Sequence, residues 1–295
     1  MKKILITGAN SYIGTSFEKW AMENCKDFQI ETQDMLGEEW KKADFSGYDT
    51  IFHVAGIAHA DVGKVSEEGK KLYYKVNADL TIECAKKAKD EGVKQFIFMS
   101  SIIVYGESAG IGKMRVITRE TPLSPANFYG DSKVKAEEGL QKLEDESFKV
   151  VILRPPMIYG KGSKGNYPLL AKMAKKLPIF PDIKNQRSML YVENLCKFIS
   201  LMIKHEERGV FFPQNAEYVQ TSVMVREIAN VARKRIIITK WLNGVIWVLG
   251  KIPGKSSLLV NKAFGNLVYD QSLRGEYERQ CIVCDFRESI AKTEE

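Results

Sequence analysis

A tyrosine and a lysine stand four residues apart, at positions 129 and 133, in the stretch FYGDSKVKAEEGL. On a helix this spacing places both side chains on one face, about one turn apart. A free tyrosine has a pKa of about 10 and is a poor base at neutral pH, but a neighbouring ammonium is predicted to lower that pKa. Tyr129 and Lys133 therefore predict an acid–base group suited to interconverting an alcohol and a ketone.

A hydroxyl at a strand end would complete such a site. The run FMSSIIVYG offers Ser100 and Ser101, and Ser101 is predicted to orient the reacting oxygen and share its developing charge. Lys133 is predicted to hydrogen-bond a nicotinamide ribose and to relay protons. The alternative for the pair of Tyr129 and Lys133 is a surface contact between a cation and an aromatic ring.

The stretch ILITGANSYIG, near the start of the chain, predicts a strand, a tight turn and a helix start. This arrangement can cradle the pyrophosphate of a dinucleotide at a helix N-terminus. Gly8 supplies the turn and Gly14 permits close packing, while Ser11 stands where a third glycine is usual and its hydroxyl can donate to phosphate. The predicted cofactor contacts in this loop are Gly8, Asn10, Ser11, Tyr12, Ile13 and Gly14.

Beyond this loop, three residues are predicted to bind the adenosine half of the cofactor: Asp34, Asp44 and Phe45. Asp34 follows the second predicted strand, where a carboxylate accepts hydrogen bonds from ribose hydroxyls. Asp44 and Phe45 are predicted to meet the adenine ring by a hydrogen bond and by packing. No arginine stands beside Asp34 to bind a ribose phosphate, which favours NAD over NADP.

Strand-like and helix-like segments alternate through the first half of the chain. Strands are predicted at 2–8, 28–34, 49–56, 95–101 and 149–156, and helices at 12–24, 72–92 and 129–143. This alternation predicts an α/β fold with a Rossmann-type, doubly wound parallel sheet. Residues 1–160 are expected to bind NAD(P), with 187–206 returning to that domain, and 161–295 to form mainly a smaller C-terminal substrate-binding lobe.

The composition is that of an ordinary soluble globular protein, with 44 basic and 37 acidic residues and a formal charge of +7. Its lysines lie among acids at helical spacing without interleaved aromatic residues, so no nucleic-acid binding is expected. No secretory signal is recognised, and five cysteines, an odd number, favour a reducing, cytoplasmic setting. The pair in CIVC (281–284) is interpreted as buried thiols, and no metal site is predicted.

The apolar stretch WLNGVIWVLG (241–250) is too short to span a bilayer, so no stable membrane insertion is expected. It is interpreted as a buried or amphipathic helix, with loose attachment to a membrane surface as the alternative. His53 and His59 are interpreted as packing and polar-edge residues rather than catalysts.

Several motifs together resemble the extended short-chain dehydrogenase/reductase family of NAD-dependent sugar-nucleotide epimerases and dehydratases. TGANSYIG is similar to the TGxxGxxG loop, FHVAG to HxAx, SSIIVYG to SSxxVYG, YGDSK to YxxxK and RPPMIYG to RPxxVYG. The resemblance covers nearly the whole chain and implies a homodimer and a nucleotide-sugar substrate, with UDP as the expected nucleotide. It also implies cofactor contacts at Ala55, Gly56 and Pro155, and substrate contacts at Asn166 and at Arg187, the latter with the diphosphate.

The residues after Ser101 narrow the expected reaction. The family's 4,6-dehydratases carry an acid pair there, whereas this chain has Ile102 and Ile103, which cannot move a proton. Hydride exchange at C4 of the sugar remains. The first hypothesis is a 4-keto-sugar reductase in surface polysaccharide synthesis, the alternative is a UDP-hexose 4-epimerase that retains NAD, and the third is a non-catalytic dinucleotide sensor.

Overall fold

The computed structural model describes residues 1–58, 65–252 and 254–295, which divide into two compact units. The first unit comprises residues 1–106, 122–156 and 192–213. The second comprises residues 107–121, 157–191 and 214–295. The chain therefore passes between the units five times, and residues 107–121 belong to the second unit although the first surrounds them in sequence.

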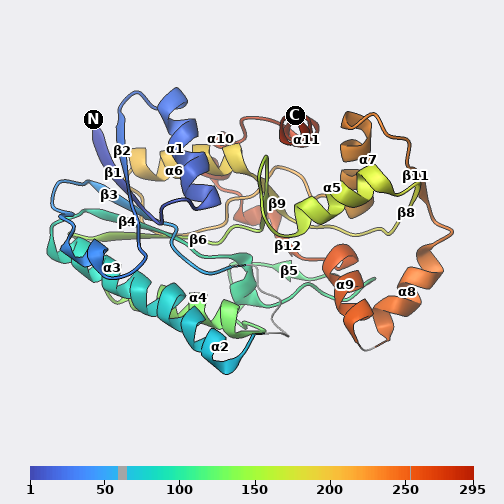
Figure 1. Ribbon diagram of the computed structural model, residues 1–295, viewed down its shortest axis with the longest axis horizontal. Helices are drawn as coiled ribbons and strands as arrows, with labels where there is room; N and C mark the ends of the chain where they lie inside the picture. Colours follow the sequence, from blue (N-terminus) through green and yellow to red (C-terminus); the bar gives the residue numbers. More distant parts are fainter. Residues whose placement is uncertain (59–64, 253) are drawn as a thin grey trace. The chain divides into compact units, whose positions relative to one another are not determined.

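A six-stranded sheet forms the centre of the first unit (Figure 1). Its strands are β1 (Lys2–Thr7), β2 (Phe28–Gln33), β3 (Thr50–His53), β4 (Gln95–Met99), β6 (Lys149–Leu153) and β10 (Gly209–Phe211). Their order is β10-β6-β4-β3-β1-β2, and every pair is parallel. Strand order reverses between β1 and β3, and parallel sheets bind ligands beyond the carboxyl ends of the strands at such a point.

Helices cover both faces of this sheet (Figure 1). On one face lie α1 (Tyr12–Asn24) and α6 (Val192–Lys204), and on the other lie α2 (Glu67–Tyr74), α3 (Leu80–Asp90) and α4 (Phe128–Gln141). A π-helical turn, Lys75–Asp79, joins α2 to α3, and short 3-10 turns occupy Glu39–Lys42 and Ile102–Tyr105. The predicted Rossmann-type doubly wound fold is confirmed, and the helix expected over 72–92 begins earlier and contains the π turn.

The burial of the strands explains their sequences. All residues of β3 and β4 are buried, as are four of the five residues of β6, because helices cover both faces of the sheet. Strands buried on both sides are continuous apolar runs, and TIFH, QFIFM and KVVIL approach that pattern. At the edge of the sheet, β2 (FQIETQ) has no buried residue and is correspondingly polar.

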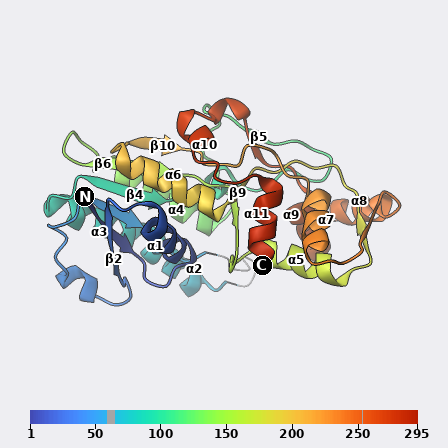
Figure 2. The same cartoon turned by 90° about the horizontal axis from the view of Figure 1, so that it is seen from above.

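The second unit contains several short helices (Figure 2), together with three pairs of parallel strands among the residues described. The strand pairs are β7 (Met157–Tyr159) with β9 (Met189–Tyr191), β8 (Ile179–Pro181) with β11 (Ile237–Thr239), and β5 (Val116–Ile117) with β12 (Val268–Tyr269). The helices are α5 (Asn166–Lys176), α7 (Thr221–Val231), α8 (Asn243–Lys251), α9 (Lys255–Phe264), α10 (Glu276–Gln280) and α11 (Phe286–Glu294), with a 3-10 turn at Gln271–Leu273.

The interpretations of the CIVC cysteines as buried thiols and of His53 as a packing residue are confirmed. Cys281 and Cys284 are buried free thiols, as are the three other cysteines. His53 is fully buried and stacks on Phe96 at a ring separation of 5.5 Å. His59 lies outside the described residues, and within the described part of the chain no helix has the length and apolar character needed to cross a membrane.

Candidate active site

The end of β4 positions Ser101, and the start of α4 positions Tyr129. Ser101 comes two residues after β4 and caps the 3-10 turn, its Oγ accepting from the N–H of Ile103 at 3.3 Å. Tyr129 lies in the first turn of α4, which Asn127 caps by accepting from Gly130 N–H at 3.1 Å. A Cβ on Gly130 would lie 2.9 Å from the carbonyl oxygen of Ile103, so only glycine lets α4 approach this closely.

The hydroxyl of Ser101 hydrogen-bonds that of Tyr129 and works to lower its pKa. Burial acts in the opposite direction and is the larger effect, and Tyr73 adds to it, so the pKa of Tyr129 rises to about 12. The prediction that Lys133 lowers the pKa of Tyr129 is therefore wrong for the chain's own residues. At neutral pH Tyr129 is a protonated phenol, which can donate its proton to a ketone oxygen.

The ammonium of Lys133 points to the carboxyl ends of the strands. Its Nζ donates to the carbonyl of Met99 at 2.8 Å and lies 4.6 Å from the centre of the Phe98 ring. A Cβ on Gly56, in the loop after β3, would lie 3.5 Å from this nitrogen. Burial lowers the pKa of Lys133 to about 8, and the charge of Glu137 partly offsets that decrease.

A buried ionic network supports the site from behind. Glu137, one turn after Lys133, accepts from the hydroxyl of Ser100 and forms an ion pair with Arg154 at 2.5 Å. The guanidinium also donates to the hydroxyl of Tyr105 at 2.6 Å. Because Glu137 and Arg154 are both buried, each must be paired for the first unit to remain stable. The network thus joins the residues that follow β4 and β6 to the helix α4, which carries Tyr129 and Lys133.

Asn77 is a positioning residue that the sequence analysis missed. It is fully buried in the π-helical turn, a form of helix frequent at functional sites. Its amide accepts from the N–H of Ile57 at 2.8 Å and donates to the carbonyl of Ile57 and to the hydroxyl of Ser132, each at 3.1 Å. Asn77 therefore clamps the loop after β3 to α4, and a polar residue inside the helical pattern KVNADL was the available signal.

The loop after β1 has the geometry of a phosphate cradle. Gly8 has a φ of 123° and Asn10 a φ of 60°, a left-handed conformation that asparagine tolerates. Ser11 caps α1 by accepting from Gly14 N–H at 3.2 Å, and its hydroxyl hydrogen remains able to donate to phosphate. The N–H groups of Tyr12 and Ile13 precede the first intrahelical hydrogen bond and are available to an anion.

Close packing between two loops forms the floor of this cradle. A Cβ on Gly8 would lie 2.6 Å from the nitrogen of Ala55, and one on Gly14 would lie 2.5 Å from the hydroxyl of Ser11. The loops after β1 and β3 therefore meet backbone to backbone at the point where strand order reverses. A helix N-terminus on one side and the Lys133 ammonium on the other fit a dinucleotide whose pyrophosphate lies on α1.

The three residues expected to bind adenosine differ in exposure: two are exposed and one is buried. Asp34 directly follows β2, and its exposed carboxylate accepts from Leu36 N–H at 2.9 Å, which fixes it near the end of the sheet. Asp44 is exposed and accepts from Ser46 N–H at 2.8 Å. The predicted packing of Phe45 on adenine is wrong, because its ring is fully buried in the core of the first unit, among Trp40 and Phe96.

The remaining residues near Ser101 have structural partners. Pro155 is buried after β6, and its carbonyl accepts from Ile102 N–H at 2.9 Å, which holds the serine turn in place. The two residues that directly follow Ser101 are Ile102 and Ile103, both half-buried, so neither of these positions supplies a carboxylate.

His53 has structural partners as well. Burial lowers the pKa of His53 to about 3, and its ring nitrogens contact the hydroxyls of Thr7 and Thr81 at 2.7 and 3.1 Å.

The second unit holds both residues expected to bind substrate. Arg187 is half-buried, and its guanidinium donates to the carbonyl of Lys262 at 2.7 Å, at the end of α9. Burial lowers the pKa of this guanidinium. Its contacts within the described residues are to carbonyl oxygens, which leaves its charge available to a diphosphate. Asn166 is the half-buried first residue of α5.

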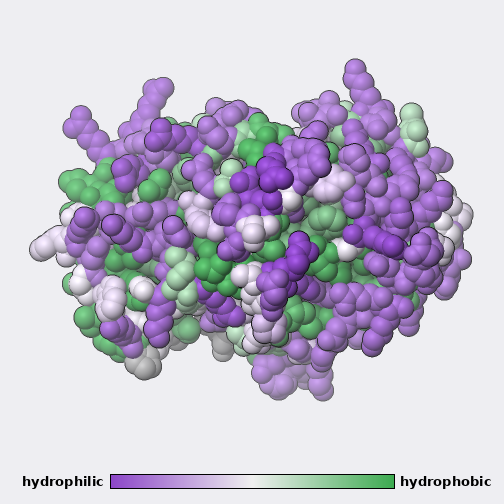
Figure 3. All heavy atoms as spheres, turned by 180° about the vertical axis from the view of Figure 1, so that it is seen from behind, coloured by the Kyte–Doolittle hydropathy of each residue, from purple (hydrophilic) through white to green (hydrophobic). Residues whose placement is uncertain are grey.

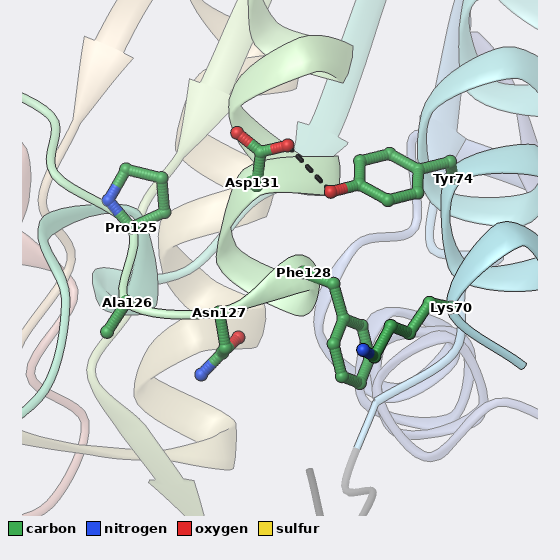
Figure 4. A pocket seen from close by; sticks show the side chains of 7 residues that line it. All are labelled: Lys70, Tyr74, Pro125, Ala126, Asn127, Phe128 and Asp131. Carbon is green, nitrogen blue, oxygen red and sulfur yellow. Dashed lines mark hydrogen bonds between the residues drawn. The ribbon is translucent and has the colours of Figure 1, made fainter. Parts of the chain in front are cut away.

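A pocket of about 480 Å³ lies at the start of α4 and is separate from the catalytic side chains (Figure 4). The residues that line it are Lys70, Tyr74, Pro125, Ala126, Asn127, Phe128 and Asp131. The hydroxyl of Tyr74 donates to Asp131 at 2.8 Å across it. The pocket thus borders the helix that carries Tyr129 without containing Ser101, Tyr129 or Lys133.

Comparison with known families identifies the class to which this fold and site belong. Residues 4–212 match the model of the NAD dependent epimerase/dehydratase family. This match includes more than half of the chain, and the chain belongs to that family. It is therefore an NAD(P)-dependent enzyme, in agreement with the cradle described above.

Two curated relatives are similar over most of the chain. One is a UDP-glucose 4-epimerase from Vibrio cholerae, 34% identical over 92% of this chain and 88% of the relative. Another is an N-acetyl-alpha-D-glucosaminyl-diphospho-ditrans,octacis-undecaprenol 4-epimerase from Escherichia coli O157:H7, 28% identical over 90% of this chain and 87% of the relative.

Solved structures share the fold at low sequence identity. A UDP-glucuronic acid 4-epimerase from Bacillus cereus in complex with NAD superposes with a TM-score of 0.73 and 15% identity, covering 99% of this chain and 97% of that one. A dTDP-4-dehydrorhamnose reductase from Clostridium acetobutylicum gives a TM-score of 0.71 and 18% identity, covering 99% and 98%. The fold thus accommodates both epimerases and reductases.

Proposed function

We propose that the enzyme transfers hydride at C4 of a UDP-linked sugar, and that the complete reaction is 4-epimerisation. The observation that carries the C4 chemistry is the hydrogen-bonded pair of Ser101 and Tyr129 beside Lys133, at the sheet edge that holds the dinucleotide cradle. Epimerisation is supported by the two relatives named 4-epimerases, which align over about nine-tenths of the chain.

Each side chain has a separate role in this proposal. The nicotinamide, when bound, accepts hydride from C4 or returns it. Tyr129 exchanges the proton of the C4 oxygen, and Ser101 donates a hydrogen bond that orients this oxygen. Lys133, anchored on the Met99 carbonyl, is placed to bond the cofactor ribose and to relay protons to and from Tyr129.

Reduction of a 4-keto sugar is the second candidate. The pKa of Tyr129, about 12, suits a proton donor to a ketone better than a base toward an alcohol. A reductase must also exchange its cofactor at each turnover, and Ser11 in place of a glycine is consistent with a less tightly held pyrophosphate. Ile102 and Ile103 argue against dehydration under either candidate, because neither side chain can move a proton.

The substrate is proposed to carry a diphosphate that Arg187 binds and a sugar that Asn166 contacts. A half-buried guanidinium whose described partners are carbonyl oxygens is suited to paired phosphate oxygens. NAD is the proposed cofactor, because the exposed Asp34 carboxylate would accept from ribose hydroxyls and repel a ribose phosphate. A homodimer in the cytoplasm remains our expectation.

Purified protein tests these proposals directly. A 4-epimerase should contain bound nicotinamide cofactor after purification and should interconvert a UDP-hexose with its C4 epimer without added cofactor. A panel of UDP-glucose, UDP-N-acetylglucosamine, their C4 epimers and the corresponding 4-keto derivatives, assayed with NADH and NADPH, identifies the sugar and the reaction.

The outcomes separate the alternatives. Stoichiometric oxidation of added NADH by a 4-keto sugar, without epimerisation, would establish the reductase and overturn the epimerase. Turnover confined to N-acetylglucosaminyl-diphospho-undecaprenol would keep the C4 chemistry and overturn the UDP-linked substrate. Cofactor binding without turnover of any of these compounds would favour the dinucleotide sensor.

A further inference from the structure

The second unit exposes many apolar side chains on and beside α8 and α9. We call residues 241–264 the α8–α9 hairpin. Eight large apolar residues are exposed between positions 241 and 259: Trp241, Val245, Trp247, Val248, Leu249, Ile252, Leu258 and Leu259. Figure 3 shows hydrophobic side chains among hydrophilic ones over this part of the chain, at the lower left. Single exposed apolar residues are ordinary, but adjacent ones indicate an interaction surface.

Contacts on the opposite side hold the hairpin in place. A Cβ on Gly250 would lie 2.9 Å from Ile111 and 3.0 Å from Val260, so this glycine packs α8 closely on its neighbours. Asn261 accepts from Ile111 N–H at 2.9 Å and donates to the carbonyl of Gly250 at 3.3 Å. The exposed residues are therefore presented by an anchored element, with Leu258 and Leu259 more than 60% exposed and Trp241 83% exposed.

The charge of this region is one-sided. Residues 228–269 contain seven lysines and arginines and no aspartate or glutamate. The rest of the chain has 37 residues of each sign, so this segment accounts for the whole formal charge of +7. Arg233, Lys234, Arg235, Lys240, Lys251 and Lys262 are exposed, and the Lys251 ammonium lies 3.9 Å from the centre of the Trp247 ring.

We propose that the α8–α9 hairpin docks on an anionic lipid bilayer. Exposed tryptophan and leucine beside lysine is the composition of helices that lie in the membrane interface, where apolar side chains enter the acyl boundary and cations bind phosphates. With nine and ten residues, α8 and α9 are each about 14 Å long and lie on a bilayer rather than cross it.

The charge argues for this occupant over a second copy of the chain. Pairing two such hairpins would bring two basic segments without acids against each other, which repels. An anionic headgroup layer instead complements the exposed Lys240, Lys251 and Lys262, each of which strengthens binding roughly fivefold near such a surface. The last turn of α9 also holds Arg187 through the Lys262 carbonyl, so docking acts on the element that positions the proposed diphosphate ligand.

Vesicle binding by the full-length protein tests the proposal without any assay of activity. The protein should sediment with vesicles of phosphatidylethanolamine and phosphatidylglycerol but not with phosphatidylcholine vesicles, and added salt should weaken binding. Of the four tryptophans, Trp40 is buried and Trp241 and Trp247 are exposed. Vesicles should therefore shift tryptophan emission to shorter wavelength, and Trp241→Phe with Trp247→Phe should remove the shift while sedimentation persists.

Two variants separate the apolar and charge contributions. Leu258→Gln with Leu259→Gln should reduce vesicle binding at least tenfold, and Lys240→Gln with Lys251→Gln about thirtyfold. Met22→Gln, at an exposed apolar site in the first unit, is the matched control and should bind normally. If a hairpin variant fails to fold, lipid selectivity and the emission shift of the unmodified protein still decide.

Three results would overturn the proposal. The first is failure of the unmodified protein to bind the anionic vesicles, and the second is equal binding by the hairpin variants and the Met22→Gln control. The third is absence of vesicle binding together with self-association, or capture of an acidic protein, that Leu258→Gln with Leu259→Gln abolishes. Since no readout involves turnover, these results are independent of the proposed C4 chemistry.

Discussion

Replacing Glu137 by glutamine should reveal how the buried ionic network supports Lys133. Glu137 and Arg154 are both buried, with an ion pair of 2.5 Å and further hydrogen bonds at 3.2 Å. Removing one partner of a buried pair costs about 3–5 kcal/mol. Glutamine keeps one acceptor, so we expect the lower value. With an unfolding entropy of about 2.1 cal/mol/K per residue, 295 residues convert ~3 kcal/mol into a decrease in Tm of about 5 °C.

The same substitution should change the pH dependence of activity. Burial lowers the pKa of Lys133 to about 8, and the charge of Glu137 works against that decrease. One helical turn separates the two side chains, and a unit charge at ~6 Å with an effective dielectric constant of ~20 contributes roughly 3 kcal/mol. Protonated Lys133 is the form proposed to act, so the alkaline limb of kcat/KM should move about one to two pH units lower in Glu137→Gln.

The assay is a pH–rate profile on the substrate that the sugar panel identifies, combined with thermal unfolding. Glu138→Gln is the matched control, because Glu138 is the exposed neighbour on the same helix. It should change neither the alkaline limb nor Tm. An unmoved limb in Glu137→Gln, with unchanged Tm, would refute both the coupling to Lys133 and the stabilising role of the pair.

Three further predictions concern single side chains. Tyr129→Phe should lower kcat by about 10²- to 10⁴-fold with cofactor affinity nearly unchanged, and near-normal turnover would exclude the proton role. Arg187→Ala should raise the KM for the nucleotide sugar about 10- to 100-fold, whereas an equal loss of affinity for cofactor, measured by titration, would contradict the assignment. Gly8→Ala should weaken cofactor binding at least tenfold, because its Cβ would lie 2.6 Å from backbone at a φ of 123°, whereas Gly47→Ala, with open space, should not; equal affinities would refute the cradle.

Local sequence determined most of the nucleotide-binding fold. The apolar runs of β3, β4 and β6 and the helical spacing between them predicted a parallel, doubly wound sheet, because burial on both faces requires such runs. The spacing of Tyr129 and Lys133, and the position of Ser101 after a strand, likewise depend on local geometry. These features are encoded within a few residues of each other.

Tertiary packing decided what depends on residues distant in sequence. Phe45 follows a polar loop, yet its ring lies in the core, and Asn77 reaches 20 residues back to Ile57 and 55 forward to Ser132. The pKa of Tyr129 is raised by desolvation and by Tyr73, and these effects outweigh the lowering by Ser101, whereas the spacing from Lys133 had suggested a lower pKa. The sequence alone specified the acid–base residues. Their protonation depends on how deeply the whole fold buries them. The tertiary structure likewise decided that the apolar side chains of the α8–α9 hairpin are exposed.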